Sequence, residues 1–209
     1  MIYNWNSRTE LLLGKERLER FSEAHVLVVG LGGVGGTAFE ALLRAGVGTI
    51  YAIDRDVVDE SNLNRQILYV REDVGKEKDL AAQKRAASIR DDVKVIPENY
   101  SVSEETLVLH DYTKCDYLLD CLDDIRAKVA LIKYSKEHAI PLIVSLGMGY
   151  RLDSTQIQII KLDKTEGDPL AKKLRSTLRD EKLNLSTILC VCSKELPLTK
   201  GPKPASLMM

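Results

Sequence analysis

The stretch His25-Val-Leu-Val-Val-Gly-Leu-Gly-Gly-Val-Gly35 decides the fold of this 209-residue chain. Residues 25–29 form a short apolar run rich in valine, which is typical of a strand buried on both faces. The glycines that follow allow a tight turn, and residues 37–45 have the composition of a helix. Such a strand–turn–helix unit brings backbone N–H groups close to a phosphate. The simpler interpretation is a glycine turn that only packs the helix against the strand.

Strand-like and helix-like segments alternate along the next hundred residues. Apolar runs that predict further strands lie at residues 50–53, 93–96, 117–119 and 141–145, and helical segments lie at 76–90, 103–110 and 125–138. This order is typical of a mainly parallel sheet with helices on both faces. We expect the third strand to stop at Pro97, because proline has no N–H to donate to a sheet ladder.

The pattern changes after residue 145. Residues 156–160 predict an added antiparallel strand, and residues 187–192 predict the last strand. Asp168 is expected to cap a helix that has Pro169 at its first position. The predicted fold class is therefore α/β and Rossmann-like, a doubly wound, mainly parallel sheet with added C-terminal antiparallel strands.

Composition places the chain among ordinary globular proteins. Hydrophobic residues make up 44% and charged residues 29%, and 30 basic against 31 acidic side chains give a net charge of -1. A protein dominated by non-specific phosphate binding would be strongly basic, so any contact with nucleic acid must be local. With no apolar run of membrane-spanning length and no signal peptide, we expect a cytoplasmic protein without a membrane anchor. We expect one domain over residues 1–195 and a short irregular tail over 196–209.

An acid stands at the end of the second predicted strand. Asp54 lies 24 residues after Gly30, where a carboxylate commonly binds the hydroxyls of a ribose. A site of this kind could hold NAD or ATP. The next residues carry a dense set of polar side chains: Asp56, Asn62, Asn64, Arg65 and Gln66. Because a redox cofactor needs no such set here, they favour a site that handles the phosphates of ATP.

Two basic side chains could serve those phosphates. Arg65 could stabilise charge on a reacting phosphate through a bidentate contact. Lys78 begins a helix and could reach the same phosphates as a point charge. Taken separately, the two also fit a solvated polar loop followed by a charged helix face.

The combined spacing resembles the superfamily of ubiquitin-activating enzymes, whose bacterial members include ThiF- and MoeB-type adenylyltransferases. The motifs that carry the resemblance are Gly30-x-Gly-Gly-x-Gly35, Asp54-x-Asp56, Asn62-x-Asn-Arg-Gln66, Gly75-x-x-Lys78 and Asp120-x-x-Asp123. The resemblance implies ATP-dependent adenylation of a carboxylate. It also implies a homodimer, in which the arginine matching Arg65 comes from the partner subunit.

The resemblance also implies roles for single residues. Asp54 would bind the ribose, while Asn62, Arg65 and Lys78 would hold the triphosphate. Arg8 matches an N-terminal arginine that touches phosphate, and Asp123 matches an aspartate associated with Mg²⁺ and catalysis. The catalytic set is thus Arg8, Arg65, Lys78 and Asp123, and the nucleotide-binding set is Gly30, Gly32, Gly33, Gly35, Asp54, Asp56, Asn62, Asn64 and Gln66.

Later residues narrow the subgroup. The chain has no Cys-x-x-Cys pair, although ThiF- and MoeB-type enzymes usually carry two for structural zinc. The stretches Gly147-Met-Gly149 and Asp168-Pro-Leu-Ala-Lys-Lys-Leu-Arg175 resemble the tRNA threonylcarbamoyladenosine dehydratases. That resemblance implies ATP-dependent activation of the threonyl carboxylate on adenosine 37 of tRNA, followed by ring closure with loss of AMP. It also implies a monovalent cation, K⁺ or Na⁺.

Alternatives stay open at this point. One is an adenylyltransferase that activates the C-terminal glycine of a ubiquitin-like sulfur carrier, and another is a nucleotide-binding scaffold without catalysis. In some relatives the cysteine matching Cys190 is linked to sulfur transfer, but here a buried strand cysteine is the simpler interpretation. Residues 172–182 carry five basic and two acidic side chains, which fits a tRNA-binding face or a solvated amphipathic helix. The three histidines show no metal-ligand spacing, and we expect structural roles for them.

Overall fold

The computed structural model describes residues 5–198 of the chain. The chain divides into two compact units, residues 1–143 and residues 144–209. The expectation of one domain over residues 1–195 stays a prediction. Most of the predicted tail, residues 199–209, lies outside the described residues.

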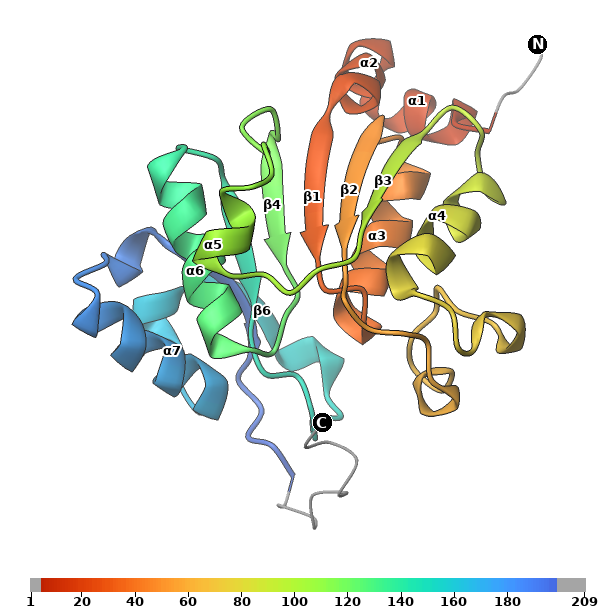
Figure 1. The fold of residues 1–209 in the computed structure, drawn as a ribbon. Helices are drawn as coiled ribbons and strands as arrows, with labels where there is room; N and C mark the ends of the chain where they lie inside the picture. The colour runs from red at the N-terminus through yellow and green to blue at the C-terminus, as the bar shows by residue number, and fades with distance from the viewer. Residues whose placement is uncertain (1–4, 199–209) are drawn as a thin grey trace. The chain divides into compact units, whose positions relative to one another are not determined.

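The order of elements follows the predicted alternation (Figure 1). The helices are α1 (Ser7–Leu13), α2 (Lys15–Glu23), α3 (Gly33–Ala45), α4 (Lys78–Ala87), α5 (Glu104–Leu107), α6 (Ile125–Glu137) and α7 (Pro169–Asp180). The strands are β1 (His25–Val29), β2 (Thr49–Ile53), β3 (Lys94–Glu98), β4 (Tyr117–Asp120), β5 (Leu142–Ser145), β6 (Ile157–Lys161) and β7 (Leu189–Ser193).

Four parallel strands form the centre of the first unit. The strand β1 pairs with β2 on one side and β4 on the other, and β2 pairs with β3. Alternate residues of β1 face opposite sides, as the two-residue period of a strand requires. Val26 and Val28 join the apolar cluster that contains Phe39 of α3, whereas Leu27 and Val29 join the cluster that contains Leu131 of α6. Both faces of the sheet are therefore covered by helices.

The second unit carries the predicted antiparallel addition. The strands β6 and β7 pair antiparallel, with Gln158 opposite Cys192 and Ile160 opposite Cys190. The hydrogen-bonded order of strands is β3-β2-β1-β4-β5-β7-β6. The predicted fold class, a Rossmann-like sheet that is mainly parallel with antiparallel strands near the C-terminus, is confirmed.

Some boundaries differ from the prediction. The strand β3 continues through Pro97 to Glu98 instead of stopping at the proline. The described part of the sheet ends at β3, so the missing N–H of Pro97 costs no ladder bond on its outer side. Helix α3 begins at Gly33, earlier than the predicted residue 37, because the glycine turn itself forms its first turn. The helices α1 and α2 were not predicted.

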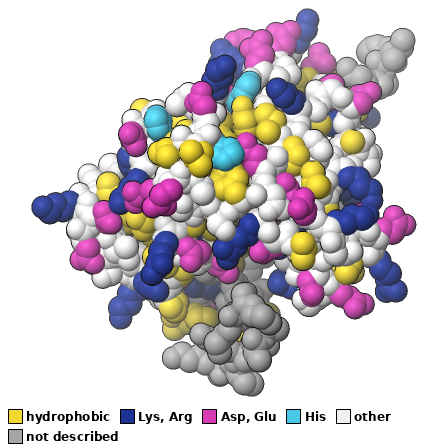
Figure 2. All heavy atoms as spheres, in the orientation of Figure 1, with side chains coloured by type: hydrophobic (Ala, Val, Ile, Leu, Met, Phe, Trp, Pro, Cys, Tyr) yellow, Lys and Arg dark blue, Asp and Glu magenta, His cyan; other side chains and the backbone are white. Residues whose placement is uncertain are grey.

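Each of the three histidines packs against a tyrosine. The ring of His25 lies 6.4 Å from that of Tyr51, while His110 stacks on Tyr100 at 4.4 Å. His138 lies 4.3 Å from the ring of Tyr134. Figure 2 shows the histidines beside hydrophobic side chains, on a face where basic and acidic groups are interspersed. These contacts agree with the expected structural roles. Among the described helices, none has the length and apolarity needed to cross a membrane.

Candidate active site

The glycine loop brings β1 and α3 into close backbone contact. Gly30 has a φ of +87°, which favours glycine, and a Cβ placed there would lie 2.9 Å from the carbonyl oxygen of Cys121. A Cβ on Gly35 would lie only 1.7 Å from the carbonyl oxygen of Gly30. These two glycines are therefore required by the packing of the helix against the strand.

Gly32 and Gly33, by contrast, have room for a side chain at their Cα atoms. The nearest atom to a Cβ on Gly32 would be Nε2 of Gln66 at 3.9 Å, and the nearest to one on Gly33 would be the carbonyl oxygen of Arg65 at 3.5 Å. Helix α3 begins here, and its first N–H groups have no partner within the helix. No neighbour among residues 5–198 requires glycine at these positions, whereas a phosphate bound against the backbone would.

Asp54 ties the glycine loop to the end of β2. Its Oδ2 accepts a hydrogen bond from the N–H of Leu31 at 2.7 Å, and its Oδ1 accepts one from the N–H of Asp56 at 2.9 Å. Burial raises the pKa of the Asp54 carboxyl, and the nearby charge of Lys78 opposes this shift. Each carboxylate oxygen keeps capacity for a further donor, such as a ribose hydroxyl. The ribose role of Asp54 stays a prediction.

Lys78 and Asp56 form an ion pair at the same edge of the sheet. The distance from Nζ of Lys78 to Oδ2 of Asp56 is 3.1 Å, and the lysine side chain is 7% exposed whereas the aspartate is 59% exposed. A short bridge between Val57 and Glu77 draws the two together, although they lie 22 residues apart. The ammonium is thus fixed, and its partner carboxylate stays open to solvent.

The polar loop after β2 folds into a capped 3₁₀ turn. Asp59 caps it by accepting the N–H of Ser61 at 2.8 Å, and the side chain of Asn62 accepts the N–H of Asp59 at 3.1 Å. The guanidinium of Arg65 donates to the carbonyl oxygen of Ser61 at 2.9 Å and to the side chain of Asn64 at 3.0 Å. These contacts hold the exposed Arg65 beside Gly33 of its own chain.

Gln66 carries an unpaired polar atom inside this site. The side chain is 5% exposed, and its Oε1 has no hydrogen-bond partner among the described residues. Burying an amide oxygen without a partner is costly, so such an atom indicates a missing donor. Its position beside Gly32 makes a bound nucleotide a suitable source of that donor.

The end of β4 contributes acidic groups with different environments. Asp120 and Lys128 of α6 form a fully buried ion pair at 2.9 Å, and burial raises the pKa of the Asp120 carboxyl. Asp124 caps α6 by accepting the N–H of Ala127 at 2.8 Å. Asp123 is exposed between them and forms no hydrogen bond or ion pair with the described residues. A free carboxylate at this strand end fits the oxygen ligand that Mg²⁺ prefers.

Arg8 lies away from this group within one chain. It belongs to α1, and α1 and α2 pack at the amino ends of the strands (Figure 1). Trp5 and Leu18 lie beside Gly46, just before β2, and the N–H of Gly48 donates to Phe21. The glycine loop lies at the carboxyl ends, about 13 Å further along β1. The structure brings the other predicted site residues to one edge and places Arg8 at the opposite one.

Sequence reasoning missed two buried groups at this edge. The hydroxyl of Tyr69 donates to the carbonyl oxygen of Leu31 at 2.8 Å and so supports the glycine loop. Asp79, in the first turn of α4, is 2% exposed and has a buried Oδ1 without a hydrogen-bond partner in the described structure. A single tyrosine in a loop and an acid in a charged helix carry no spacing signal, so nothing in the sequence pointed to either.

The described residues hold no group of three or more His, Cys, Asp or Glu side chains placed to bind a metal. Cys190 is fully buried in β7, as the simpler interpretation expected. Its thiol is therefore out of reach of a sulfur donor in this structure. The predicted monovalent cation stays a prediction, because no group in the described part of the chain identifies a site for it.

Comparisons with known proteins agree with this geometry. A family model described as the ThiF family matches residues 4–188. The tRNA threonylcarbamoyladenosine dehydratase of Escherichia coli K12 is 39% identical over 180 residues, which cover 85% of this chain and 67% of that protein. A crystal structure of the E. coli enzyme in complex with ATP matches with a TM-score of 0.85 and 37% identity, and covers 95% of this chain and 86% of that chain.

Sulfur-carrier enzymes match over a shorter stretch. A sulfur carrier protein ThiS adenylyltransferase of Bacillus subtilis is 33% identical over 149 residues, which cover 68% of this chain and 44% of that protein. The resemblance that the sequence motifs predicted is confirmed. The chain belongs to the ThiF family and, within it, to the tRNA threonylcarbamoyladenosine dehydratases.

Proposed function

We propose that this chain uses ATP to adenylate the threonyl carboxylate of threonylcarbamoyladenosine at position 37 of tRNA, and then closes a ring with release of AMP. The observation that carries the proposal is the open cradle at Gly32 and Gly33, which lies beside Arg65 and the unpaired oxygen of Gln66. The ATP complex of the E. coli relative supports ATP as the nucleotide.

The first step is attack of the carboxylate on the α-phosphorus, with pyrophosphate as the leaving group. Backbone N–H groups at the start of α3 hold the phosphates, and the positive end of the helix favours their charge. The guanidinium of Arg65 and the ammonium of Lys78 stabilise the charge that develops on the leaving group. Both are held before the nucleotide arrives, Arg65 by Ser61 and Lys78 by Asp56.

The second step needs no covalent nucleophile from the protein. A group of the threonylcarbamoyl moiety attacks the activated carbonyl, so that a ring forms and AMP leaves with net loss of water. The protein contributes position and charge stabilisation to this step. Asp123 would hold Mg²⁺ through its exposed carboxylate, and a bound Mg²⁺ would supply charge neutralisation of the phosphate oxygens.

The active form would be a homodimer. Arg8 cannot join the cradle within one chain, because α1 lies at the opposite edge of the sheet. The resemblance implied that the partner subunit supplies Arg65, but Arg65 lies beside Gly33 of its own chain. The dimer proposed here therefore takes Arg8, and not Arg65, from the second copy. We place the enzyme in the cytoplasm, where its tRNA substrate would meet ATP.

The decisive experiment measures AMP from ATP with three substrates: tRNA that carries threonylcarbamoyladenosine, unmodified tRNA, and a carrier protein that ends in Gly-Gly. We expect AMP only with the modified tRNA, together with loss of about 18 Da, one water, from the nucleoside. AMP formation only with the carrier would replace the proposal by sulfur-carrier adenylation. ATP binding without AMP from any substrate would indicate a nucleotide-binding scaffold.

Variants of the two basic residues test the site itself. Removing a donor to a developing charge typically costs about 10²- to 10³-fold in rate, and we expect this for Arg65→Ala and for Lys78→Ala. In Lys78→Ala, Asp56 loses its ion-pair partner, but its carboxylate is exposed to solvent, so the fold should tolerate the change. Lys76→Ala is the matched control, since Lys76 is half exposed and pairs with Asp73 at 3.7 Å. Full activity in both site variants would contradict the assignment.

A further inference from the structure

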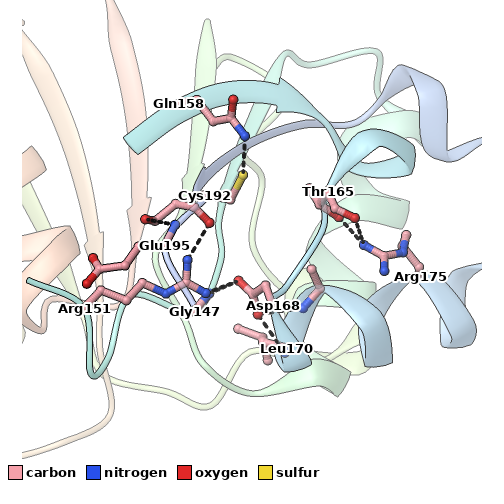
Figure 3. Close-up of polar contacts among 11 residues, drawn as sticks. Gly147, Arg151, Gln158, Thr165, Asp168, Leu170, Arg175, Cys192 and Glu195 are labelled. Atoms are coloured by element: carbon pink, nitrogen blue, oxygen red, sulfur yellow. Dashed lines mark hydrogen bonds and ion pairs between the residues drawn. The ribbon is translucent and has the colours of Figure 1, made fainter. Parts of the chain in front are cut away.

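The turn that follows β5 is held from several sides. The N–H of Gly147 donates to Oδ2 of Asp168 at 2.8 Å, and Asp168 is itself the buried N-cap of α7 (Figure 3). The guanidinium of Arg151 lies between Asp168, at 3.8 Å, and the carbonyl oxygen of Ser193, at 2.5 Å. Its side chain is 5% exposed. The buried side chains of Asp168 and Arg151 thus fix one side of this turn.

Residues 150–153, at the end of the turn, are held by a second set of contacts. The carboxylate of Glu195 accepts the N–H of Leu152 at 2.9 Å and the N–H of Asp153 at 2.9 Å. The carbonyl oxygen of Tyr150 accepts the N–H of Leu198 at 2.7 Å. Contacts to side chains from distant parts of the sequence preorganise what the tip of a turn presents.

The tip presents Tyr150. Its side chain is exposed, with 56% of the residue accessible, and its φ is +61°. A bulky residue in the left-handed region costs free energy and persists only where the surrounding structure enforces it. The side chain makes no hydrogen bond and no ring contact with the described residues. The enforced backbone conformation therefore sets the direction in which the Cα–Cβ bond of this exposed aromatic residue leaves the turn.

Charge indicates the kind of partner. Residues 144–209 contain eleven Lys and Arg against seven Asp and Glu, a net charge of +4, whereas the whole chain has -1. On α7, Lys172, Lys173 and Arg179 are exposed, as is Lys182 just beyond it. Arg175 differs, because it donates to the carbonyl oxygen of Thr165 at 2.7 Å. The hydrogen bond from Gly147 to Asp168 joins the turn to the start of α7. Exposed basic side chains together with an exposed aromatic ring are the combination that binds single-stranded nucleic acid.

We propose that the ring of Tyr150 stacks on an unpaired base of the anticodon loop, while the exposed lysines and arginine of α7 neutralise its phosphates. This inference rests on the proposed function, because that function supplies tRNA as the ligand. It adds a substrate-binding residue outside the motifs that hold ATP. Stacking on the ring would hold an unpaired base of the loop that carries the modified adenosine.

A tryptophan at position 150 tests the stacking directly. The chain has one tryptophan, Trp5, so the wild type gives the background fluorescence. The probe is an anticodon stem–loop RNA that carries threonylcarbamoyladenosine. We expect Tyr150→Trp to lose fluorescence on binding this RNA beyond the wild-type change, and to show no such loss with a fully paired duplex.

An affinity series tests the energetic contribution. Loss of one stacked base by alanine substitution corresponds to about 5- to 150-fold weaker binding, which we expect for Tyr150→Ala, while Tyr150→Phe keeps near wild-type affinity. Tyr150→Gly serves as a second variant, because glycine adopts positive φ without cost. It therefore removes the ring without adding backbone strain, so that the effect of losing the ring is measured by itself. Leu152→Ala is the matched control, since Leu152 is 82% exposed in the same turn.

Two results would overturn the inference. One is wild-type affinity in both Tyr150→Ala and Tyr150→Gly, and the other is an equal loss in Leu152→Ala. A stacking residue raises KM for tRNA and leaves kcat at saturating RNA unchanged. Failure of the proposed function looks different, because the wild type itself would then form no AMP with modified tRNA.

Discussion

Four glycines in one loop serve two purposes. Gly35 permits a backbone contact that any Cβ would block, since that Cβ would lie 1.7 Å from the carbonyl oxygen of Gly30. Gly33 has its nearest neighbour at 3.5 Å, which is ordinary van der Waals contact. We therefore predict that Gly35→Ala lowers the melting temperature by several degrees or prevents folding. Gly33→Ala should fold normally and lose at least about tenfold in ATP affinity.

Thermal melts and nucleotide titrations on the two variants check this prediction. Gly14→Ala is the control for a strained glycine outside the site, because Gly14 has a φ of +83° and no atom within 4 Å. It should lose some stability and keep its ATP affinity. Unchanged ATP binding in Gly33→Ala would mean that the loop only packs the helix against the strand.

At the scale of elements, Glu40 joins α3 to α4. Its carboxylate accepts from Nε of Arg85 at 3.0 Å and from Nη2 of Arg44 at 2.8 Å, and its side chain is 11% exposed. The hydrogen bond from Arg85 holds the pKa of Glu40 below its ordinary value, against the opposing effect of burial. We predict that Glu40→Gln lowers the free energy of unfolding at pH 7 by about 1–2 kcal/mol, the smaller figure reflecting the partial exposure of the arginines.

The pH dependence has a defined sign. A depressed pKa in the folded state gives stability that is present above the ordinary glutamate pKa of 4.5 and disappears as pH falls through the folded value. Denaturant unfolding from pH 7 to pH 3 should therefore show the two proteins converging at the acid end. Glu16→Gln is the control, since Glu16 and Arg20 form a pair exposed by 81% and 74%. A difference that stays constant across the range would contradict the electrostatic explanation.

At the scale of the whole molecule, Arg8 and Lys78 lie at opposite edges of the sheet, and the proposed dimer would let both serve one site. Arg8→Ala and Lys78→Ala should each be inactive alone. In a mixed dimer, the Arg8→Ala subunit keeps its own Lys78 and receives Arg8 from its partner, which gives one complete site. Random mixing should restore about a quarter of wild-type activity.

The mixed-dimer measurement uses two tagged variants that are unfolded and refolded together. The control is Lys78→Ala mixed with Arg65→Ala. We expect no recovery there, because Arg65 lies beside the glycine loop of its own chain, so that each site of the mixed dimer carries one of the two lesions. If the first mixture stays inactive, Arg8 acts within its own subunit and the dimer proposal loses its main support.

The sequence by itself determined the elements whose signal is local. Alternation of apolar runs with helical segments predicted the parallel sheet, and the glycine turn with Asp54 predicted a nucleotide site at the carboxyl ends of the strands. Asp168 and Pro169 marked the start of α7, and the structure confirms that N-cap. Each of these rests on neighbouring residues, because a strand, a cap or a turn forms within a few positions.

The tertiary structure alone decided the features that need distant residues to meet. In the tertiary structure Lys78 pairs with Asp56 across a loop, and the side-chain oxygen of Gln66 is buried without a partner among the described residues. Arg8 lies at the opposite edge of the sheet from both. The tertiary structure also let β3 run through Pro97, since only the position of a strand in the sheet shows whether an N–H is needed. The turn that carries Tyr150 is held by Asp168 and Glu195, which follow Tyr150 by 18 and 45 residues, and no local pattern encodes such contacts.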